Sequence, residues 1–145
     1  MDDISRLVER ARMAAQRAYA PYSGFHVGCA IESRDGSIVT GANMENASYR
    51  LGLCAEQAAL AAAQHAFGLG QIARIVVAGG PAGDHTAAGK EPITPCGGCR
   101  QAIHEAAMVA GRDIEVVCAG VSGEAMIRTS IAELLPISFD LGPKG

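Results

Sequence analysis

The chain has 145 residues and a formal net charge of −3, with 49% hydrophobic and 19% charged residues. This length suits a single domain over residues 1–145, and the hydrophobic content excludes a disordered chain. A protein that binds a nucleic-acid duplex needs clustered Lys or Arg to neutralise phosphates. The sequence has no basic run, so no nucleic-acid partner is expected.

The sequence also gives no sign of a membrane or export segment. No apolar run reaches the roughly 18–20 residues that span a bilayer. The N-terminal stretch MDDISRLVER is acidic and then amphipathic, without the apolar centre of a signal peptide. We therefore expect a cytoplasmic protein. In that reducing compartment the five cysteines are expected to serve in metal binding or catalysis rather than in disulfides.

Hydrophobic periodicity, turn signals and helix breakers predict an alternation of helices and strands. The predicted elements, in chain order, are a helix over 3–19, strands over 26–33 and 37–42, a helix over 54–67, a strand over 72–79, a helix over 97–110, strands over 114–119 and 125–129, and a short helix over 131–135. Pro21 ends the first helix, and Asp35-Gly36 is typical of a tight hairpin turn. An exposed loop is predicted over residues 80–92.

This order predicts an α/β domain with a mixed sheet. The short links at 34–37 and 121–124 require antiparallel strand pairs, whereas helical crossovers require parallel strands. The helices over 54–67 and 97–110 each follow a strand and a loop. Their first turns could therefore meet at one end of the sheet, where α/β folds bind their ligands.

Cysteines begin both of these helices. Cys96-Gly97-Gly98-Cys99 is a C-x-x-C pair, which alone is ambiguous between a redox pair and half a zinc site. Cys54 begins the other helix. A helix N-terminus lowers the pKa of a thiol, because unpaired N–H groups and the helix dipole stabilise thiolate. Three thiolates at two such ends would make a three-cysteine metal site.

The ligand count indicates the kind of site. Structural zinc usually has four protein ligands, whereas catalytic zinc usually has three and a water. Cys29 and Cys118 lie in apolar strand sequences, and we expect both in the core. No histidine lies at ligand spacing beside the three cysteines, and ordinary positions are expected for His26, His65, His85 and His104. The site is one protein ligand short, so water is expected to complete it.

Glu56 lies two residues after Cys54, in the first turn of the alanine-rich helix. An isolated acid there would simply interact favourably with the helix dipole. Beside a zinc-bound water, a carboxylate can take a proton and later return it to a leaving group. We therefore predict that Glu56 is a proton shuttle.

The combination Cys54-Ala55-Glu56 and Pro95-Cys96-Gly97-Gly98-Cys99 resembles the signature of the zinc-dependent nucleoside and nucleotide deaminases. The resemblance is closer to small cytidine deaminases of the three-cysteine class, and it extends nearly from end to end. The segments that carry it are PYSGFHVGCA, TGANMENASYRLGLCAE, PCGGCRQ and ELLPISF.

The resemblance implies a three-layer α/β/α fold around a mixed five-stranded sheet, assembled as a homotetramer with one Zn²⁺ per subunit. It implies hydrolysis of cytidine and deoxycytidine to uridine and deoxyuridine with release of ammonia, a reaction of pyrimidine salvage. Water activated on zinc would attack C4 of the base, while Glu56 moves protons to the ring nitrogen and the departing amino group.

The resemblance also implies roles for individual residues. Cys54, Cys96 and Cys99 match the zinc ligands, and Glu56 matches the proton shuttle. The remaining matches concern substrate: Phe25 at the pyrimidine ring, the Ala55 backbone at the base, Asn43 and Glu45 at the ribose 3′-hydroxyl, and Ala47 and Tyr49 toward the ligand of a neighbouring subunit.

Gln57 departs from the pattern, because three-cysteine members often have an arginine there that offsets thiolate charge. Three thiolates on Zn²⁺ leave a net charge of −1. Gln57 can donate a hydrogen bond to sulfur but has no positive charge. We expect Arg100 and the helix N-termini to compensate.

Three other functions fit the sequence less well. A related deaminase of a nucleoside antibiotic or of a deoxynucleotide would keep the zinc motif. The segment NMENAS favours a free nucleoside, and a phosphate site would need more Lys or Arg. Editing of cytosine in RNA or DNA would need a basic groove. A structural-zinc interaction domain would need a fourth protein ligand and would give Glu56 no role.

Overall fold

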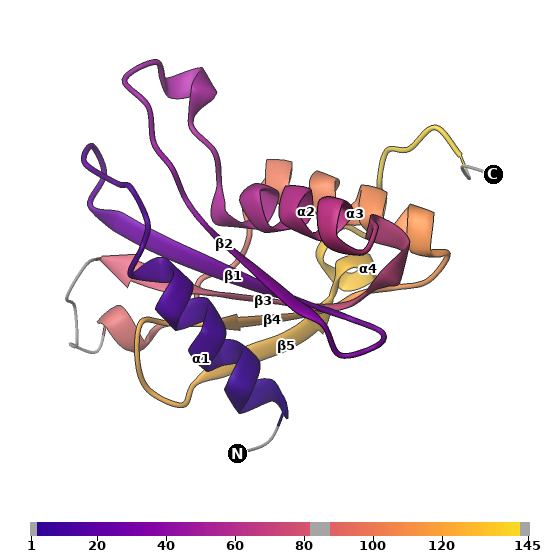
Figure 1. Cartoon of the computed structure of the whole chain (residues 1–145), viewed down its shortest axis with the longest axis horizontal. Helices are drawn as coiled ribbons and strands as arrows, with labels where there is room; N and C mark the ends of the chain where they lie inside the picture. Colours follow the sequence, from indigo (N-terminus) through magenta and orange to yellow (C-terminus); the bar gives the residue numbers. More distant parts are fainter. Residues whose placement is uncertain (1–2, 82–87, 143–145) are drawn as a thin grey trace.

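The computed structural model describes residues 3–81 and 88–142 and confirms the predicted order of the longer helices and strands (Figure 1). The elements are α1 (Asp3–Ala15), β1 (Phe25–Ser33), β2 (Ile38–Ala42), η1 (Tyr49–Leu51), α2 (Ala55–Ala66), η2 (Leu69–Gln71), β3 (Ile72–Pro81), η3 (Ala88–Lys90), α3 (Gly97–Ala110), β4 (Glu115–Ala119), β5 (Met126–Ser130) and α4 (Ile131–Leu134). No helix in these ranges is long and apolar enough to cross a membrane.

The five strands form one mixed sheet in the order β2-β1-β3-β4-β5. The two short links produce antiparallel pairs, β1 with β2 and β4 with β5, as predicted. The pair β3 and β4, joined through α3, is parallel, and β1 is antiparallel to β3. The carboxyl ends of β3 and β4 therefore lie at the same edge of the sheet.

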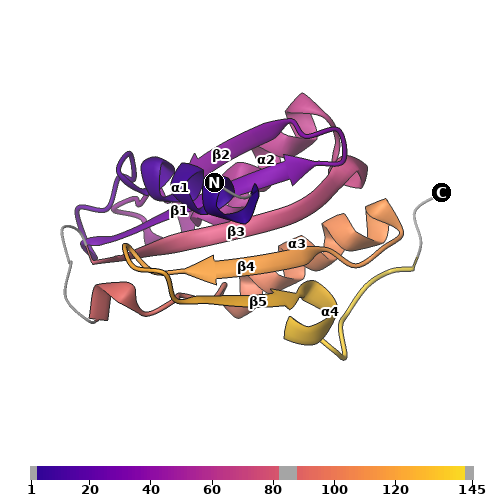
Figure 2. The same cartoon turned by 90° about the horizontal axis from the view of Figure 1, so that it is seen from below.

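Helices cover both faces of the sheet, which gives the expected three layers (Figures 1 and 2). On one face, α1 buries Ile4, Leu7 and Ala11 against the side chains of Ala30 and Val76. On the other face, α2, α3 and α4 share a larger core that includes Ile75, Ile103 and Ile131. Burial of these apolar side chains is the main stabilising contribution to the fold.

Two glycines let the helices lie close to the strands. A Cβ atom on Gly28 would overlap the carbonyl oxygen of Ala11, so α1 lies directly on β1. A Cβ on Gly41 would lie 2.5 Å from the backbone nitrogen of Ala59, so α2 lies directly on β2. Real Cβ atoms do not approach backbone this closely, and both positions therefore require glycine. These contacts fix where α2 begins, and with it the position of Cys54.

The first helix is shorter than the predicted span of 3–19, because it ends at Ala15. The following residues pair instead with the segment after β2. The Tyr19 N–H donates to the Asn43 carbonyl (2.9 Å), and the Tyr19 carbonyl accepts from the Glu45 N–H (2.8 Å). This long-range pairing competes with the last turn of the predicted helix, and Pro21 lies beyond it.

The predicted loop over 80–92 is also partly wrong. β3 continues to Pro81, because Gly80 and Pro81 pair with the first residues of β1, and Ala88–Lys90 forms the short helix η3. Residues 82–87 lie outside the described residues, and the predictions for that part of the loop and for His85 lie there too. The other predicted boundaries agree with the structure to within one or two residues.

Candidate active site

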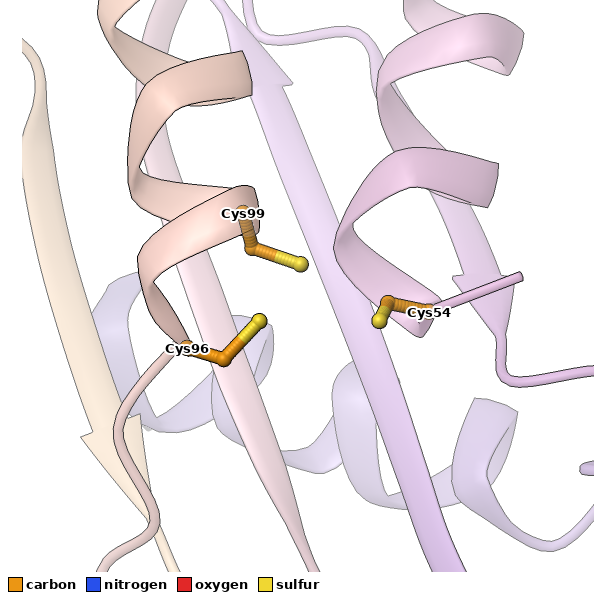
Figure 3. Close-up of side chains that lie close together, drawn as sticks. All are labelled: Cys54, Cys96 and Cys99. Atoms are coloured by element: carbon orange, nitrogen blue, oxygen red, sulfur yellow. The ribbon is translucent and has the colours of Figure 1, made fainter. Parts of the chain in front are cut away.

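The three predicted ligand cysteines come together at the N-termini of α2 and α3 (Figure 3). Their sulfur atoms all lie within 4.8 Å of one another. Cys54 is the N-cap residue of α2, Cys96 is the N-cap residue of α3, and Cys99 lies in the first turn of α3. Two helix N-termini thus direct their partial positive charge toward this three-cysteine cluster.

The donor set of the cluster fits zinc. Thiolates are ligands that zinc prefers, and a C-x-x-C turn with a third cysteine gives three of them. Among the described residues, no fourth His, Cys, Asp or Glu belongs to the group. Three protein ligands leave one coordination position open, which is typical of a catalytic zinc site rather than a structural one.

The three thiols differ in their surroundings. Burial raises the pKa of Cys99 and, less strongly, that of Cys54. The pKa of the exposed Cys96 is lowered, chiefly by a hydrogen bond from the Cys99 N–H. Zinc binds thiolates, so loading of the cluster must release protons from the buried thiols.

The remaining cysteines lie in the core, as predicted. Cys29 and Cys118 are fully buried, and burial raises the pKa of Cys118 to about 11. His104 is directed to the C-terminal segment, where its Nε2 lies 3.1 Å from an Asp140 carboxylate oxygen and 3.1 Å from the Ser138 hydroxyl. His26 lies in β1 and His65 in α2, and neither belongs to the cysteine cluster.

A cavity of about 550 Å³ opens in front of the cluster. Its lining residues come from the turn before β1, from β1, from the segment after β2, from the start of α2 and from the segment before α3; they are Ser23, Phe25, Val27, Asn43, Glu45, Cys54, Ala55, Glu56, Pro92, Ile93, Thr94, Cys96 and Cys99. The structure therefore brings most of the predicted site residues to one cavity.

Glu56 lies in this cavity with only 5% of its surface exposed. Burial raises the pKa of its carboxyl group, while hydrogen bonds, including one with Cys99, act in the opposite direction. A carboxyl group whose pKa is moved toward neutrality is suited to both accept and donate a proton. The location and the environment of Glu56 both fit an acid–base residue.

Asn43 lies at the mouth of the cavity and fixes the start of β1. Its Oδ1 accepts from the Val27 N–H (2.8 Å), and its Nδ2 donates to the Phe25 carbonyl (2.9 Å). Phe25 is partly exposed in the same cavity. The predicted contacts of Asn43 and Phe25 with substrate stay predictions.

Glu45 likewise stabilises the backbone, at the turn before β1. Its Oε1 accepts from the N–H groups of Tyr22 (3.0 Å) and Ser23 (3.1 Å), and its Oε2 accepts from the Ser23 hydroxyl. The Ser23 hydroxyl lowers the pKa of Glu45 more than any other group does. Ser23 Oγ also accepts from the Phe25 N–H (3.0 Å). Ser23 therefore links the glutamate to the aromatic residue.

Sequence reasoning did not assign a role to Ser23, Val27 or the segment Pro92–Thr94, although all of them line the cavity. Ser23 lies inside the stretch PYSGF, so attention to each polar residue of that stretch would have found it. Val27 has the appearance of any strand residue. Pro92–Thr94 lies in a loop without a motif, and only the three-dimensional path of the chain places it here.

Ala47 and Tyr49 do not line this cavity. Tyr49 is 82% exposed, and its ring meets Tyr22 edge to face with centroids 6.2 Å apart. Both residues lie on the exposed segment between β2 and α2. Their predicted role toward a neighbouring subunit stays a prediction.

The two residues considered for charge compensation lie in different surroundings. Gln57 Nε2 donates to Cys99 Sγ over 3.8 Å. Arg100 Nε donates to the Pro95 carbonyl (2.8 Å), and its Nη1 donates to the Leu134 carbonyl (3.1 Å). The guanidinium thus bonds to backbone oxygens beside the metal loop, and its predicted electrostatic role stays a prediction.

Comparison with known proteins agrees with this site. The profile of the family described as the cytidine and deoxycytidylate deaminase zinc-binding region matches residues 1–112. The chain belongs to this family. A cytidine deaminase of Halalkalibacterium halodurans is 38% identical over 137 residues, which are 94% of each chain. A cytidine deaminase of Mycobacterium tuberculosis is 42% identical over 103 residues, 71% of each chain.

Solved structures show the same fold. The crystal structure of cytidine deaminase from Burkholderia pseudomallei matches with a TM-score of 0.80 and 41% identity, covering 96% of this chain and all of that one. The crystal structure of cytidine deaminase from Mycobacterium tuberculosis matches with a TM-score of 0.74 and 33% identity, covering 97% of this chain and 100% of that one.

Removal of one thiol from the cluster tests zinc binding. Cys99→Ser replaces a soft ligand with a poor one, so we expect the purified variant to contain far less than one zinc per chain. Cys118→Ser is the matched control, because it changes a buried thiol outside the cluster. Elemental analysis by mass spectrometry measures both. Full zinc content in Cys99→Ser would contradict the assignment.

Proposed function

We propose that this protein hydrolyses cytidine and deoxycytidine to uridine and deoxyuridine and releases ammonia, as a cytoplasmic step of pyrimidine salvage. The observation that carries the proposal is the shared cavity: the buried carboxyl group of Glu56 and the three-cysteine cluster line the same space of about 550 Å³. A family of zinc-binding deaminases is the context in which both features have a role.

The chemistry requires two proton transfers, and Glu56 can carry out both. Cys54, Cys96 and Cys99 would hold zinc, which would supply the Lewis acidity that makes water nucleophilic near neutral pH. The Glu56 carboxylate takes a proton from the attacking water and gives it to the ring nitrogen beside C4. It then moves the second proton of the water to the 4-amino group, which leaves as ammonia. The carboxylate is regenerated at the end.

The side chains of Asn43 and Glu45 can each form a further hydrogen bond with a substrate. We place the pyrimidine against Phe25 and the Ala55 backbone, with the ribose 3′-hydroxyl at Asn43 and Glu45. The amide nitrogen of Asn43 has a second hydrogen, and the carboxylate of Glu45 has further lone pairs. A hydroxyl can accept from the first and donate to the second.

The charge of the cavity favours a nucleoside over a nucleotide. Among its described lining residues there is no Lys or Arg, whereas two are glutamates. A 5′-phosphate would meet no cation and would be repelled by these carboxylates. The same absence disfavours a nucleic-acid substrate, whose backbone needs a basic groove.

Arg100 is proposed to supply positive charge to the thiolates from beside the metal loop, with Gln57 donating a neutral hydrogen bond. Arg100→Gln should then lower kcat/KM for cytidine by about tenfold, which corresponds to roughly 1.4 kcal/mol. Arg100→Lys keeps the charge but not the fork geometry, so it should recover part of the loss. An unchanged kcat/KM in Arg100→Gln would contradict the electrostatic role of Arg100.

A homotetramer is the proposed assembly. The exposed segment between β2 and α2 supports it, because the apolar or aromatic residues Met44, Tyr49 and Leu51 expose more than half of their surfaces there. In a tetramer, Ala47 and Tyr49 would lie toward a neighbour's ligand. Sedimentation equilibrium should give about four times the 14.9 kDa chain mass. A fully active monomer would contradict the proposal.

The first experiment is the deamination of cytidine by zinc-loaded protein, followed by ultraviolet absorbance. Glu56→Gln keeps the size of the side chain but cannot shuttle protons, so kcat should fall by about 10²- to 10⁴-fold at matched zinc content. Cytidine 5′-monophosphate is the second substrate, and we expect little turnover of it.

Each result has a distinct meaning. Equal activity of parent and Glu56→Gln would exclude the proton-transfer role. A folded parent with one zinc per chain and no turnover of cytidine would mean that another pyrimidine is the substrate. Preference for the monophosphate would contradict the charge argument.

A further inference from the structure

One wall of the cavity belongs to no helix or strand. Pro92, Ile93 and Thr94 line the cavity between η3 and α3. This wall segment is bonded to the end of β4, and η3, which precedes it, is bonded to the turn after β4. The Ile93 N–H donates to the Ala119 carbonyl (3.3 Å). The Gly89 carbonyl accepts from the N–H groups of Val121 (2.7 Å) and Ser122 (3.4 Å).

The turn after β4 is also bonded to α1, the helix that lies on the face of the sheet opposite to the cysteine cluster. Arg12 Nε donates to the Gly120 carbonyl (3.0 Å), and Arg12 Nη2 donates to the Gly123 carbonyl (2.9 Å). One planar guanidinium thus bridges both ends of the Gly120–Gly123 turn. Figures 1 and 2 show η3 and the β4–β5 turn together at one end of the sheet, beside the last part of α1.

The contact between the turn and the wall segment is tight. A Cβ on Gly120 would lie 2.5 Å from the Gly89 oxygen, 2.7 Å from the Lys90 carbonyl carbon and 2.8 Å from the Glu91 oxygen. All three atoms are backbone, so the chain would have to move. Gly123 has a φ of +84°, and a Cβ there would lie 3.1 Å from Lys90 Cγ. A shift of the turn must therefore move residues 89–91 and the wall that follows them.

We propose that Arg12 is a positioning residue for substrate binding, which fixes the Gly120–Gly123 turn and through it the cavity wall Pro92–Thr94. The kinetic part rests on the proposed function. Glu56 and Cys54 are placed by α2, which packs mainly on β2 and β1, on the face of the sheet opposite to α1 and Arg12. Loss of Arg12 therefore loosens one wall while Glu56 and Cys54 keep their places. Such a change raises KM and leaves kcat nearly constant.

The test compares Arg12→Gln with Arg10→Gln, which changes an exposed arginine on the same helix. In zinc-loaded protein, Arg12→Gln should raise KM for cytidine about three- to tenfold with kcat within twofold of the parent. Arg10→Gln should leave both constants within twofold. Arg12→Lys can replace one of the two bonds and should give an intermediate KM.

Hydrogen exchange measured by mass spectrometry tests the structural part without any turnover. Peptides covering 88–94 and 119–123 should exchange faster in Arg12→Gln than in the parent or in Arg10→Gln, whereas peptides from α2 should not change. Gly120→Ala is the second variant, and it should raise KM and speed exchange in the same peptides while zinc content stays at one per chain.

Unchanged exchange at 88–94 in Arg12→Gln would overturn the positioning role. Faster exchange with an unchanged KM would overturn its effect on substrate binding, and a fall in kcat with constant KM would do the same. A parent that does not deaminate cytidine would refute the proposed function, while faster exchange would still support the link from Arg12 to the wall.

Discussion

The meeting of two helix N-termini above the carboxyl ends of β3 and β4 is the constraint on which the site depends. Three sulfur atoms within 4.8 Å of one another require α2 and α3 to begin side by side. Small residues make this possible, because Gly41 lets α2 lie on the backbone of β2 and alanines bury its inner face. Glu56 then enters the cavity simply as the second residue of α2.

The same arrangement addresses the charge of the site. Three thiolates and Zn²⁺ carry a net charge of −1, and the nearby carboxylate of Glu56 adds to it when ionised. Each helix N-terminus is equivalent to roughly +0.5 charge, so two of them are of the size needed to offset the cluster. Gln57 adds only a neutral hydrogen bond to Cys99 Sγ, so the two helix N-termini and, as proposed, Arg100 offset the charge in place of an arginine at position 57.

The sequence predicted the parts of the site that local patterns encode. C-A-E and P-C-x-x-C predicted the three-cysteine cluster with Glu56 beside it, because metal binding needs fixed residue types at fixed spacing. The order of elements followed from hydrophobic periodicity. The early end of α1 could not be predicted, because Tyr19 pairs with Asn43 and Glu45 far along the chain. The wall at Pro92–Thr94 could not be predicted for the same reason, because its hydrogen bond to Ala119 joins distant parts of the sequence.

The two residues proposed to bind the ribose also stabilise the backbone that lines the cavity. Asn43 and Glu45 bond to the backbone at the start of β1 and the turn before it, on either side of Phe25. They are therefore oriented before a ligand arrives, which lowers the entropy that binding must overcome. The consequence is that a substitution of Glu45 changes two things at once: the proposed contact with the sugar and the position of Ser23 and Phe25. The effect of Glu45 on affinity is thus coupled to that of Ser23, and a double-mutant cycle of the two residues would be non-additive.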